Sequence, residues 1–345
     1  MIIARSGAGN AVTEASDARP PLRTVKRVTV SVSARLHLGF VDLNGDMGRR
    51  FGSVGIAIDK PQTRVVVERS ERTQIEGPDE ARAQGYLEAL IRRFNLDHRL
   101  HLKVAEVIPS HVGLGSGTQL GLATGAALSH FFGLGLDART LAGLLARGAR
   151  SSIGIATFES GGVVLDGGRG DRDEPPPVLS RLPFPDDWRV LLVYDRRRQG
   201  LHGPAEIDAF RRLPTFPSEQ AAHLCRTMLM IALPALAEAD FERFSAGVAE
   251  LQRVIGDHFR PVQGARFMSP AVAEVLAWLE SEGIVGVGQS SWGPTGFALV
   301  DGEAAAARLL AAARRRWSPP ASDLSFAVTH GRNRGADIEV LPVEA

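Results

Sequence analysis

The chain has 345 residues, 44% of them hydrophobic and 23% charged, which is enough to bury a sizeable core and suggests two domains. A formal net charge of +1 at pH 7 gives no general electrostatic reason to expect nucleic acid or a membrane surface as a partner. Cys225 is the single cysteine, which excludes disulfides within the chain and cysteine-based zinc sites, and fits a reducing cytoplasm.

The first half of the chain reads as alternating strands and helices. Residues 1–24 are polar and lack an apolar signal core, so we predict a disordered tail. Alternating apolar and β-branched residues predict strands at 27–34, 53–58, 63–68 and 100–107, with a turn at Asp59-Lys60-Pro61 between the second and third. Helices are predicted at 78–94, 118–132 and 137–147. Four glycines, Thr124 and His130 interrupt the apolar stretch 120–136, so we expect no membrane span.

The second half continues the pattern after two irregular segments. Residues 154–170 are rich in glycine and predict one short strand, and the Pro- and charge-rich residues 171–187 predict a linker. Further strands are predicted at 188–194, 284–287, 295–300 and 324–329, with a last one near Ile338. Two or three helices are expected within 218–255, and others at 270–280 and 303–315. The prediction is an α+β protein with domains at 25–180 and 181–345.

A glycine-rich loop precedes the helix predicted at 118–132. Residues 108–128 read IPSHVGLGSGTQLGLATGAAL, with Gly113, Gly115 and Gly117 within five residues. Glycines at this position let an anion approach the free N–H groups and the positive dipole end of a helix, so the loop predicts a phosphate site. Ser116 and Thr118 could add hydroxyl donors. The alternative is a glycine-rich connector. The loop lacks the GK[ST] of a Walker A motif and the spacing of a dinucleotide fingerprint.

Three segments resemble the GHMP superfamily, which includes galactokinase, homoserine kinase and mevalonate kinase. IPSHVGLGSGTQ is similar to the phosphate loop, SARLHLGFVDLNG to the N-terminal substrate segment, and GVGQSSWGPTGFALV to the C-terminal glycine-rich loop. The resemblance covers about residues 26–340. It implies a two-domain GHMP fold, with a ribosomal-S5-like N-terminal domain, a ferredoxin-like C-terminal domain and a site in the cleft between them.

The departures from the kinase pattern point to one branch of this superfamily. The bulky Trp292 and Pro294 stand in the C-terminal loop, and the Asp that many kinases carry before a Gly-Gly pair is missing. With RGARSSIGIATFESGG and QGLHGPAE, the segments resemble the β-ribofuranosylaminobenzene 5′-phosphate synthases. That resemblance implies an enzyme, a pentosyltransferase, which condenses 4-aminobenzoate or 4-hydroxybenzoate with phosphoribosyl pyrophosphate, releasing pyrophosphate and CO2. The product is a C-riboside for tetrahydromethanopterin biosynthesis in one-carbon metabolism.

The expected cofactor is Mg²⁺, and the expected location is the cytoplasm. The expected partners are the two small-molecule substrates, without nucleic acid or membrane. A homodimer is possible, because apolar helices within 218–255 could bury in a core or in a dimer interface. Two other functions stay open. One is a small-molecule kinase that uses ATP, and the other is a ligand-binding relative without catalysis.

The chemistry assigns roles to three candidate catalytic residues. Arg35 could pair with the benzoate carboxylate, and its alternative is an ion pair with Asp42 or Asp59. Asp42 could hydrogen-bond the amino or hydroxyl group of the ring, or belong to a turn before Asn44. Glu159 could hold Mg²⁺ together with substrate oxygens, or cap a turn.

The other candidates bind phosphate or the aromatic ring. Phosphate binding is expected from the loop and the arginines beyond the next helix: Gly113, Leu114, Gly115, Ser116, Gly117, Thr118, Gln119, Arg147 and Arg150. Substrate binding is expected from seven residues: His37, Phe40, His202, Ser290, Ser291, Trp292 and Thr295. His37 could instead be a packed core histidine. Arg196–Arg198 could contact the 5′-phosphate or form a solvated charge run, and Glu206 could meet His202 at the cleft.

Overall fold

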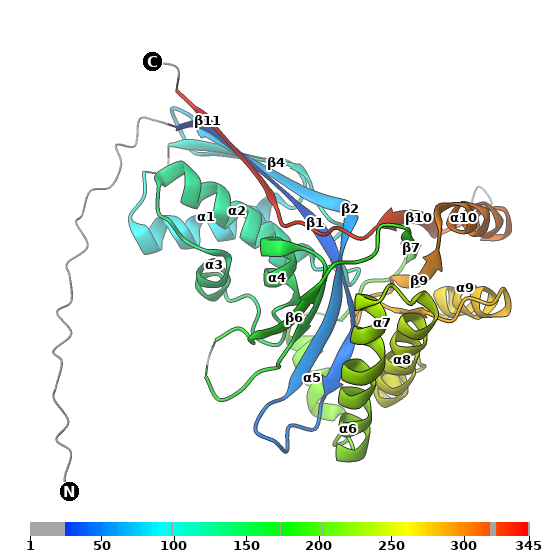
Figure 1. Ribbon diagram of the computed structural model, residues 1–345. Coiled ribbons are helices and arrows are strands. Elements are labelled where there is room, and N and C mark those ends of the chain that lie inside the picture. Colours follow the sequence, from blue (N-terminus) through cyan, green and yellow to red (C-terminus); the bar gives the residue numbers. More distant parts are fainter. Residues whose placement is uncertain (1–24, 98, 173, 202, 318–321, 344–345) are drawn as a thin grey trace, which may run out of the picture.

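The computed structural model describes residues 25–97, 99–172, 174–201, 203–317 and 322–343. The predicted tail 1–24 and His202 lie outside this part of the chain. The described residues form two β-sheets, each with helices packed against it (Figure 1), which confirms the α+β class. No helix in the described ranges is long and apolar enough to cross a membrane.

The larger sheet is built around one long hairpin. Strands β1 (Val25–Asp42) and β2 (Phe51–Arg69) pair antiparallel along their length, and β4 (Leu100–Glu106), β3 (Gln74–Glu76), β5 (Val163–Asp166) and β6 (Val178–Leu182) extend the sheet. Helices α1 (Glu80–Phe94), α2 (Ser116–Phe132), α3 (Ala138–Leu144) and α4 (Ile153–Ser160) lie on one side of it. Along β1, burial alternates in the first half and becomes nearly continuous from Val32 onward. The reason is that the second half of the strand also packs against α8.

The smaller sheet has the strand order β10-β7-β9-β8. Its strands are β7 (Trp188–Asp195), β8 (Val287–Gln289), β9 (Gly296–Asp301) and β10 (Leu324–His330), with α9 (Pro270–Ser281) and α10 (Glu303–Trp317) packed against them. Along the chain, helices lie between β7 and β8 and again between β9 and β10. Together with the strand order in the sheet, this is the predicted ferredoxin-like arrangement.

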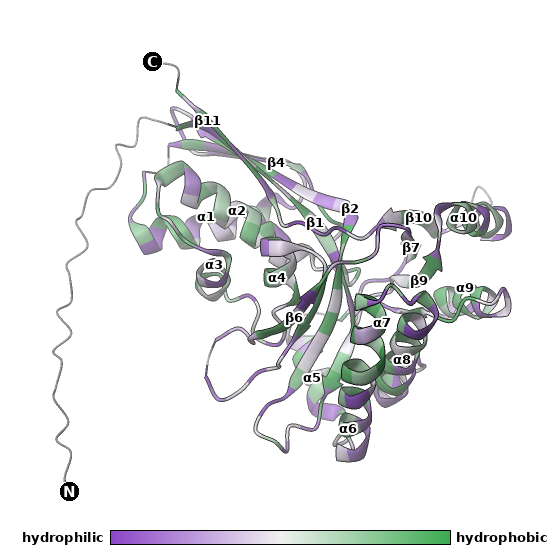
Figure 2. Ribbon diagram, viewed as in Figure 1, coloured by the Kyte–Doolittle hydropathy of each residue, from purple (hydrophilic) through white to green (hydrophobic). Residues whose placement is uncertain are grey.

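A helical segment fills the space between the small sheet and the β1–β2 hairpin (Figure 1). It contains α5 (Gly203–Arg212), α6 (Ser218–Thr227), the π-helix η1 (Met228–Ala232), α7 (Leu233–Ala237) and α8 (Phe241–Gln263). In Figure 2 these helices carry hydrophobic and hydrophilic residues side by side, as expected for helices buried on one side. One apolar core joins them to the hairpin, through side chains such as Leu36, Val248 and Leu251. Leu229, Met230 and Ile231 of η1 remain exposed.

Several predicted boundaries were wrong. A turn was expected at Asp59-Lys60-Pro61, but these residues lie inside the single strand β2. The Lys60 N–H donates to Thr329 Oγ1, so the hydrogen bonding between strands is interrupted there while the chain keeps its direction. The strand expected at 284–287 begins only at Val287, because the Ile284 N–H bonds to Leu279 O and closes α9.

Two segments predicted as irregular contain regular structure. Residues 153–160 form α4, whose Gly154 packs against Thr118 of α2. The predicted linker 171–187 contains β6, which pairs with β5. The last strand, β11 (Asp337–Pro342), returns to pair with β1 in the larger sheet. The division into domains at residue 180 stays a prediction, but the end of the chain belongs to the first sheet.

Candidate functional site

The glycine loop joins β4 to α2 and leaves the start of that helix open. Gly115 is the N-cap, with a left-handed conformation of φ 81° that favours glycine. Among the described residues no side chain caps α2, and its first turn contains no acidic residue. The first N–H groups of a 17-residue helix therefore point out beside a partly exposed loop edge. This geometry suits an anion.

Each of the three loop glycines faces a different neighbour. Gly113 lies against the main chain of Ser290 and Gly293 in the C-terminal loop, where a side chain would clash. A methyl group on Gly115 would lie 3.1 Å from Nε of Arg35. A methyl group on Gly117 would lie 3.6 Å from Nη1 of both Arg82 and Arg147. Gly113 thus permits close loop packing, while Gly115 and Gly117 lie beside arginines.

Arg35 forms part of the loop's support. Its backbone N–H donates to Leu114 O at 3.2 Å, and its Nη1 donates to Gly113 O at 2.7 Å. Burial lowers the pKa of Arg35 to about 10, and Glu206 partly opposes this shift. The alternative ion pair with Asp59 is not formed among the described residues, because Asp59 pairs with Arg332 at 3.5 Å. Arg35 remains a cation at neutral pH, held next to Gly115.

Arg82 and Arg147 both lie beside Gly117. Arg82 contacts His111 at 3.1 Å and Asp79 at 3.1 Å. The Arg147 guanidinium lies 5.2 Å from the ring centre of Tyr86, and its buried Nε has no hydrogen-bond partner among the described residues. The Tyr86 hydroxyl donates to Gly117 O at 2.9 Å. Two guanidinium groups therefore meet at Gly117, in the first turn of α2.

Sequence reasoning missed Arg82. It lies on a helix with no motif around it, and only its spacing from Tyr86 (four residues, one helical face) was available as a signal. Arg150 makes different contacts: it pairs with Glu206 at 2.6 Å, sits 5.2 Å from the ring centre of Phe210, and its charge acts on His37. The contribution of Arg150 to phosphate binding stays a prediction: Arg150 lies near His37, whereas Arg147 lies beside Gly117 of the loop.

The buried loop residues hold the structure together. Leu114 belongs to the apolar core, and Ser116 is buried. Gln119 is fully buried, and its side-chain amide donates to Gly154 O at 3.0 Å and Thr157 Oγ1 at 3.3 Å. Thr118 is partly exposed beside Gly154. Of the predicted loop side chains, only Thr118 lies at the open edge.

The C-terminal loop docks on the glycine loop and on β1. Ser290 Oγ accepts from the His37 N–H at 3.0 Å and donates to Gly113 O at 2.7 Å, while the Ser291 N–H donates to His37 O at 3.1 Å. Ser291 has a positive φ of 55°, which costs of order 1–3 kcal/mol and is retained where the surroundings hold it. Thr295 is fully buried. The structure thus brings the three predicted segments together at one place.

Aromatic rings gather next to this junction. Phe40 lies 4.6 Å from His37 and 6.0 Å from Phe210, and Phe259 lies 4.4 Å from Trp292. Trp292 is only 2% exposed and belongs to the core. It was expected to offer a wall to the substrate ring, but in this structure Phe259 and Phe210 cover it.

Asp42 and Glu159 lie away from the loop. Asp42 accepts from the Asn44 and Gly45 N–H groups and so closes the β1–β2 turn, roughly 20 Å along the strand from Arg35. Glu159 is exposed at the end of α4, where Asp137 and Arg139 act on its charge. Within the described ranges, no group of three or more His, Cys, Asp or Glu side chains could hold a metal ion. The position of Glu159 does not fit a magnesium ligand at the loop.

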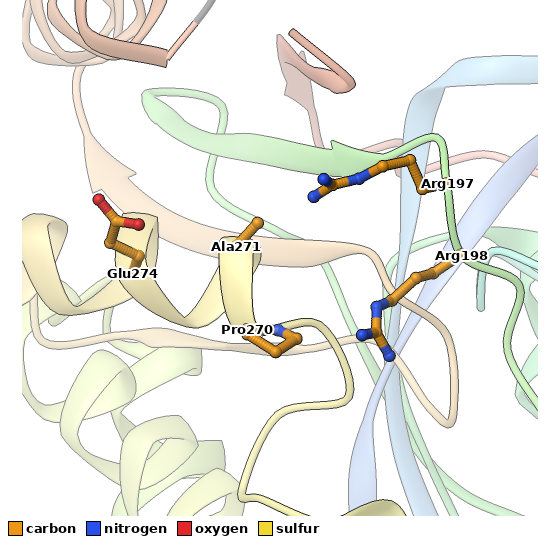
Figure 3. A pocket seen from close by; sticks show the side chains of 5 residues that line it. All are labelled: Arg197, Arg198, Pro270, Ala271 and Glu274. Carbon is orange, nitrogen blue, oxygen red and sulfur yellow. The ribbon is translucent and has the colours of Figure 1, made fainter.

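A second arginine-lined hollow, of about 600 Å³, lies at the start of α9 (Figure 3). Arg197 and Arg198 extend over Pro270 and Ala271, with Glu274 further along the helix. Asp195 contacts Arg197 at 3.1 Å and Arg198 at 4.0 Å, and Arg196 donates to Ser322 O at 2.7 Å. The arginine triplet therefore makes structural contacts, while Gly200, two residues beyond it, donates its N–H to His111 O just before the glycine loop.

Comparison with known proteins places this geometry in a family. Residues 81–162 match the family of GHMP kinases N terminal domains, and residues 232–319 match the GHMP kinases C terminal family. Among solved structures, homoserine kinase from Cytophaga hutchinsonii has a TM-score of 0.64 at 17% identity, covering 91% of this chain and 98% of that one. Mevalonate diphosphate decarboxylase from Staphylococcus aureus has the same TM-score and coverage at 15% identity. These likenesses confirm the predicted two-domain GHMP fold.

Sequence relatives narrow the assignment. The β-ribofuranosylphenol 5′-phosphate synthase of Methanothermobacter thermautotrophicus is 31% identical over 339 residues, which is 90% of this chain and 98% of that protein. The enzyme of the same name from Archaeoglobus fulgidus is 30% identical over 325 residues, 89% of this chain and 98% of that protein. Similarity of this extent covers both domains and the loops between them. The chain is therefore a member of the β-ribofuranosylphenol 5′-phosphate synthase family, built on the two-domain GHMP fold.

Proposed function

We propose that the protein is a pentosyltransferase that condenses a para-substituted benzoate with phosphoribosyl pyrophosphate, in tetrahydromethanopterin biosynthesis in the cytoplasm. One observation carries the proposal: an open helix N-terminus, with Arg35 beside Gly115 and with Arg82 and Arg147 beside Gly117, lies next to a cluster of aromatic rings. An anionic donor and an aromatic acceptor need these two features side by side.

In the proposed reaction, the arginine side chains at the glycine loop stabilise the negative charge of the leaving pyrophosphate. The bond from ribosyl C1 to pyrophosphate breaks, and its electron pair leaves with the pyrophosphate. The ring carbon that bears the carboxylate attacks C1, and loss of CO2 then returns an electron pair to the ring and restores aromaticity. Backbone N–H groups and guanidinium groups aimed at the developing negative charge would stabilise this step. We assign the pyrophosphate to α2, Arg82 and Arg147.

The aromatic acid is proposed to approach from the side of Arg35. The relatives are named for a ribofuranosylphenol product, and a phenol arises when the acid carries a para-hydroxyl group. We therefore place 4-hydroxybenzoate first and 4-aminobenzoate second. Its carboxylate would lie next to Arg35, whose cation is buried and held at Gly115.

Mg²⁺ stays in the proposal as a partner of the pyrophosphate. This ion commonly keeps water and phosphate oxygens and takes one or two carboxylates from the protein. Among the carboxylates near the junction, Glu206 acts on the charge of Arg35, so it fits such a role better than Glu159. When bound, the ion would supply charge neutralisation for the leaving pyrophosphate.

A single assay tests the function. The protein is incubated with phosphoribosyl pyrophosphate, Mg²⁺ and carboxyl-labelled 4-hydroxybenzoate, with 4-aminobenzoate in parallel. We expect labelled CO2 and pyrophosphate in equal amounts. ADP formation from ATP, stimulated by a small alcohol and without CO2 release, would assign the protein to the kinases instead. Binding of both substrates without any product would indicate a non-catalytic relative.

We also propose a homodimer. The three exposed apolar side chains of η1, Leu229, Met230 and Ile231, are adjacent in the chain and would be covered in such an assembly. Sedimentation of the wild type and of Met230→Glu tests this: a dimer that the substitution dissociates supports the proposal, and a wild-type monomer at all concentrations refutes it.

A further inference from the structure

A small cavity lies between β1, α8 and the C-terminal loop. Its volume is about 20 Å³, and its lining includes His37, Phe40, Gln252, Phe259, Gln263 and Gln289. A cavity of this size has room for about one water molecule, or for one heavy atom with its hydrogens. The lining is part apolar and part polar, so its occupant should be small and able to form hydrogen bonds.

His37 is the lining side chain that lacks hydrogen-bond partners. It is 3% exposed, and neither ring nitrogen has a partner in the described part of the chain. The other polar groups are engaged. Gln252 donates to the main chain of β1 and accepts from the Gln289 N–H, and Gln289 accepts from the Met268 N–H. The cationic Arg266 is paired with Asp257 through two contacts of 2.9 and 3.0 Å.

The imidazole of His37 is uncharged at neutral pH. Burial, and then the neighbouring cations Arg35 and Arg150, lowers the pKa of His37 to about 3. A neutral imidazole has one N–H donor and one free lone pair. The two unpaired ring nitrogens of His37 therefore match a group that both donates and accepts a hydrogen bond. An anion is disfavoured, because it would be desolvated in this cavity.

We propose that this cavity receives the para-hydroxyl group of the aromatic acid, and that His37 recognises it by a hydrogen bond. The inference rests on the function proposed above. A hydroxyl is one heavy atom with a donor and an acceptor, like the water that would fit. The ring would displace or reorder part of the aromatic cluster at Phe40 and Phe259, which also line the cavity.

The same geometry sets the direction of the substrate. Arg35 and His37 are two residues apart on a regular stretch of β1, so their side chains leave the same face roughly 7 Å apart, and the Arg35 guanidinium then reaches the glycine loop at Gly113 and Gly115. With the hydroxyl at His37, the carboxylate-bearing carbon would lie near Arg35 and the glycine loop. That is the carbon that must meet ribosyl C1. His37, which was expected among the substrate-binding residues, is thus a specificity and positioning residue for the para group, the contact that was expected of Asp42.

The test compares acids with and without a para group. Turnover of 4-hydroxybenzoate and inhibition by unsubstituted benzoate are measured for the wild type, His37→Leu, His37→Asn and the control His258→Gln. His258 is a matched control because its ring lies 5.8 Å from Phe259 but outside the cavity lining. We expect the wild type and His258→Gln to bind 4-hydroxybenzoate at least about tenfold more tightly than benzoate, a preference that corresponds to about 1.4 kcal/mol. His37→Leu should lose this preference, and His37→Asn should keep part of it.

The outcomes separate the two proposals. If the wild type releases no CO2 from either acid, the proposed function fails and this inference with it. If the wild type is active but His37→Leu slows turnover and keeps the preference over benzoate, His37 has only a structural role. Should His37→Leu fail to fold, NMR of the wild type labelled with ¹⁵N at histidine decides the question. A change at the His37 ring nitrogens on adding 4-hydroxybenzoate, but not benzoate, is expected, and equal spectra would refute the inference.

Discussion

Replacing Gly117 with alanine should weaken binding of phosphoribosyl pyrophosphate without lowering the stability of the fold. Gly117 is in the first turn of α2, and it is not among the glycines with positive φ. Alanine is favoured over glycine in helices by up to about 1 kcal/mol, so stability should stay the same or rise slightly. The added methyl group would lie 3.6 Å from Nη1 of Arg82 and of Arg147, an ordinary contact for the protein alone. It would, however, occupy the space in which we place the pyrophosphate.

The expected loss is in donor binding. Displacing the anion from one charge-assisted hydrogen bond costs about 1.5–3 kcal/mol, so the KM for phosphoribosyl pyrophosphate should rise roughly 10- to 150-fold. The KM for the aromatic acid should change little. Steady-state kinetics and urea unfolding of the same preparations measure both effects. Arg147→Gln should reproduce the kinetic change by removing the cation instead of the space.

Gly85→Ala is the matched control. Gly85 lies in α1, and a methyl group there would have no neighbour within 4 Å. It should give the same small stabilisation with unchanged kinetics. If Gly117→Ala is stable and keeps a normal KM for the donor, the pyrophosphate does not bind at this turn, and the assignment of Arg82 and Arg147 is wrong.

The remaining predictions concern Arg35, Trp292 and His37. Arg35→Gln should raise the KM for the aromatic acid more than that for the donor, because an Arg–carboxylate pair is lost; equal increases in the two KM values would point to a role in loop structure only. Trp292→Ala should lower the free energy of unfolding by about 3–5 kcal/mol, since the indole is 2% exposed, and denaturant curves that match the wild type would show that the ring is not packed as described. The depressed pKa of His37, about 3, means that acid favours the unfolded chain, where the imidazole is protonated. The contribution of the His37 imidazole to the free energy of unfolding is fully present above about pH 6.5. As the pH falls from 6.5 to 3, the free energy of unfolding should decrease by up to about 4–5 kcal/mol. Urea titrations across this range should show a smaller fall for His37→Asn, and equal falls in the two proteins would contradict the reasoning.

Much of the fold and part of the site could be predicted from local patterns. The alternation in 27–34 and the glycine-rich run 113–117 each reflect a neighbourhood of a few residues, and the structure has β1 and the start of α2 there. The resemblance of three segments also indicated the fold and the junction at which they meet. Arg35 was identified in this way because it lies within one of those segments, and Arg147 because it begins the further segment RGARSSIGIATFESGG.

Only the tertiary structure decided which distant groups meet. Arg82 lies beside Gly117 because α1 packs against α2. The local sequence of α1 does not predict which helix α1 packs against. Similarly, the periodicity of β11 predicts a strand but not its pairing with β1. Glu159 and Asp42 had suitable chemistry, yet their positions on α4 and at the hairpin turn keep them from the loop. A sequence pattern specifies the buried face of an element, whereas the partner of that face depends on the packing of the whole core.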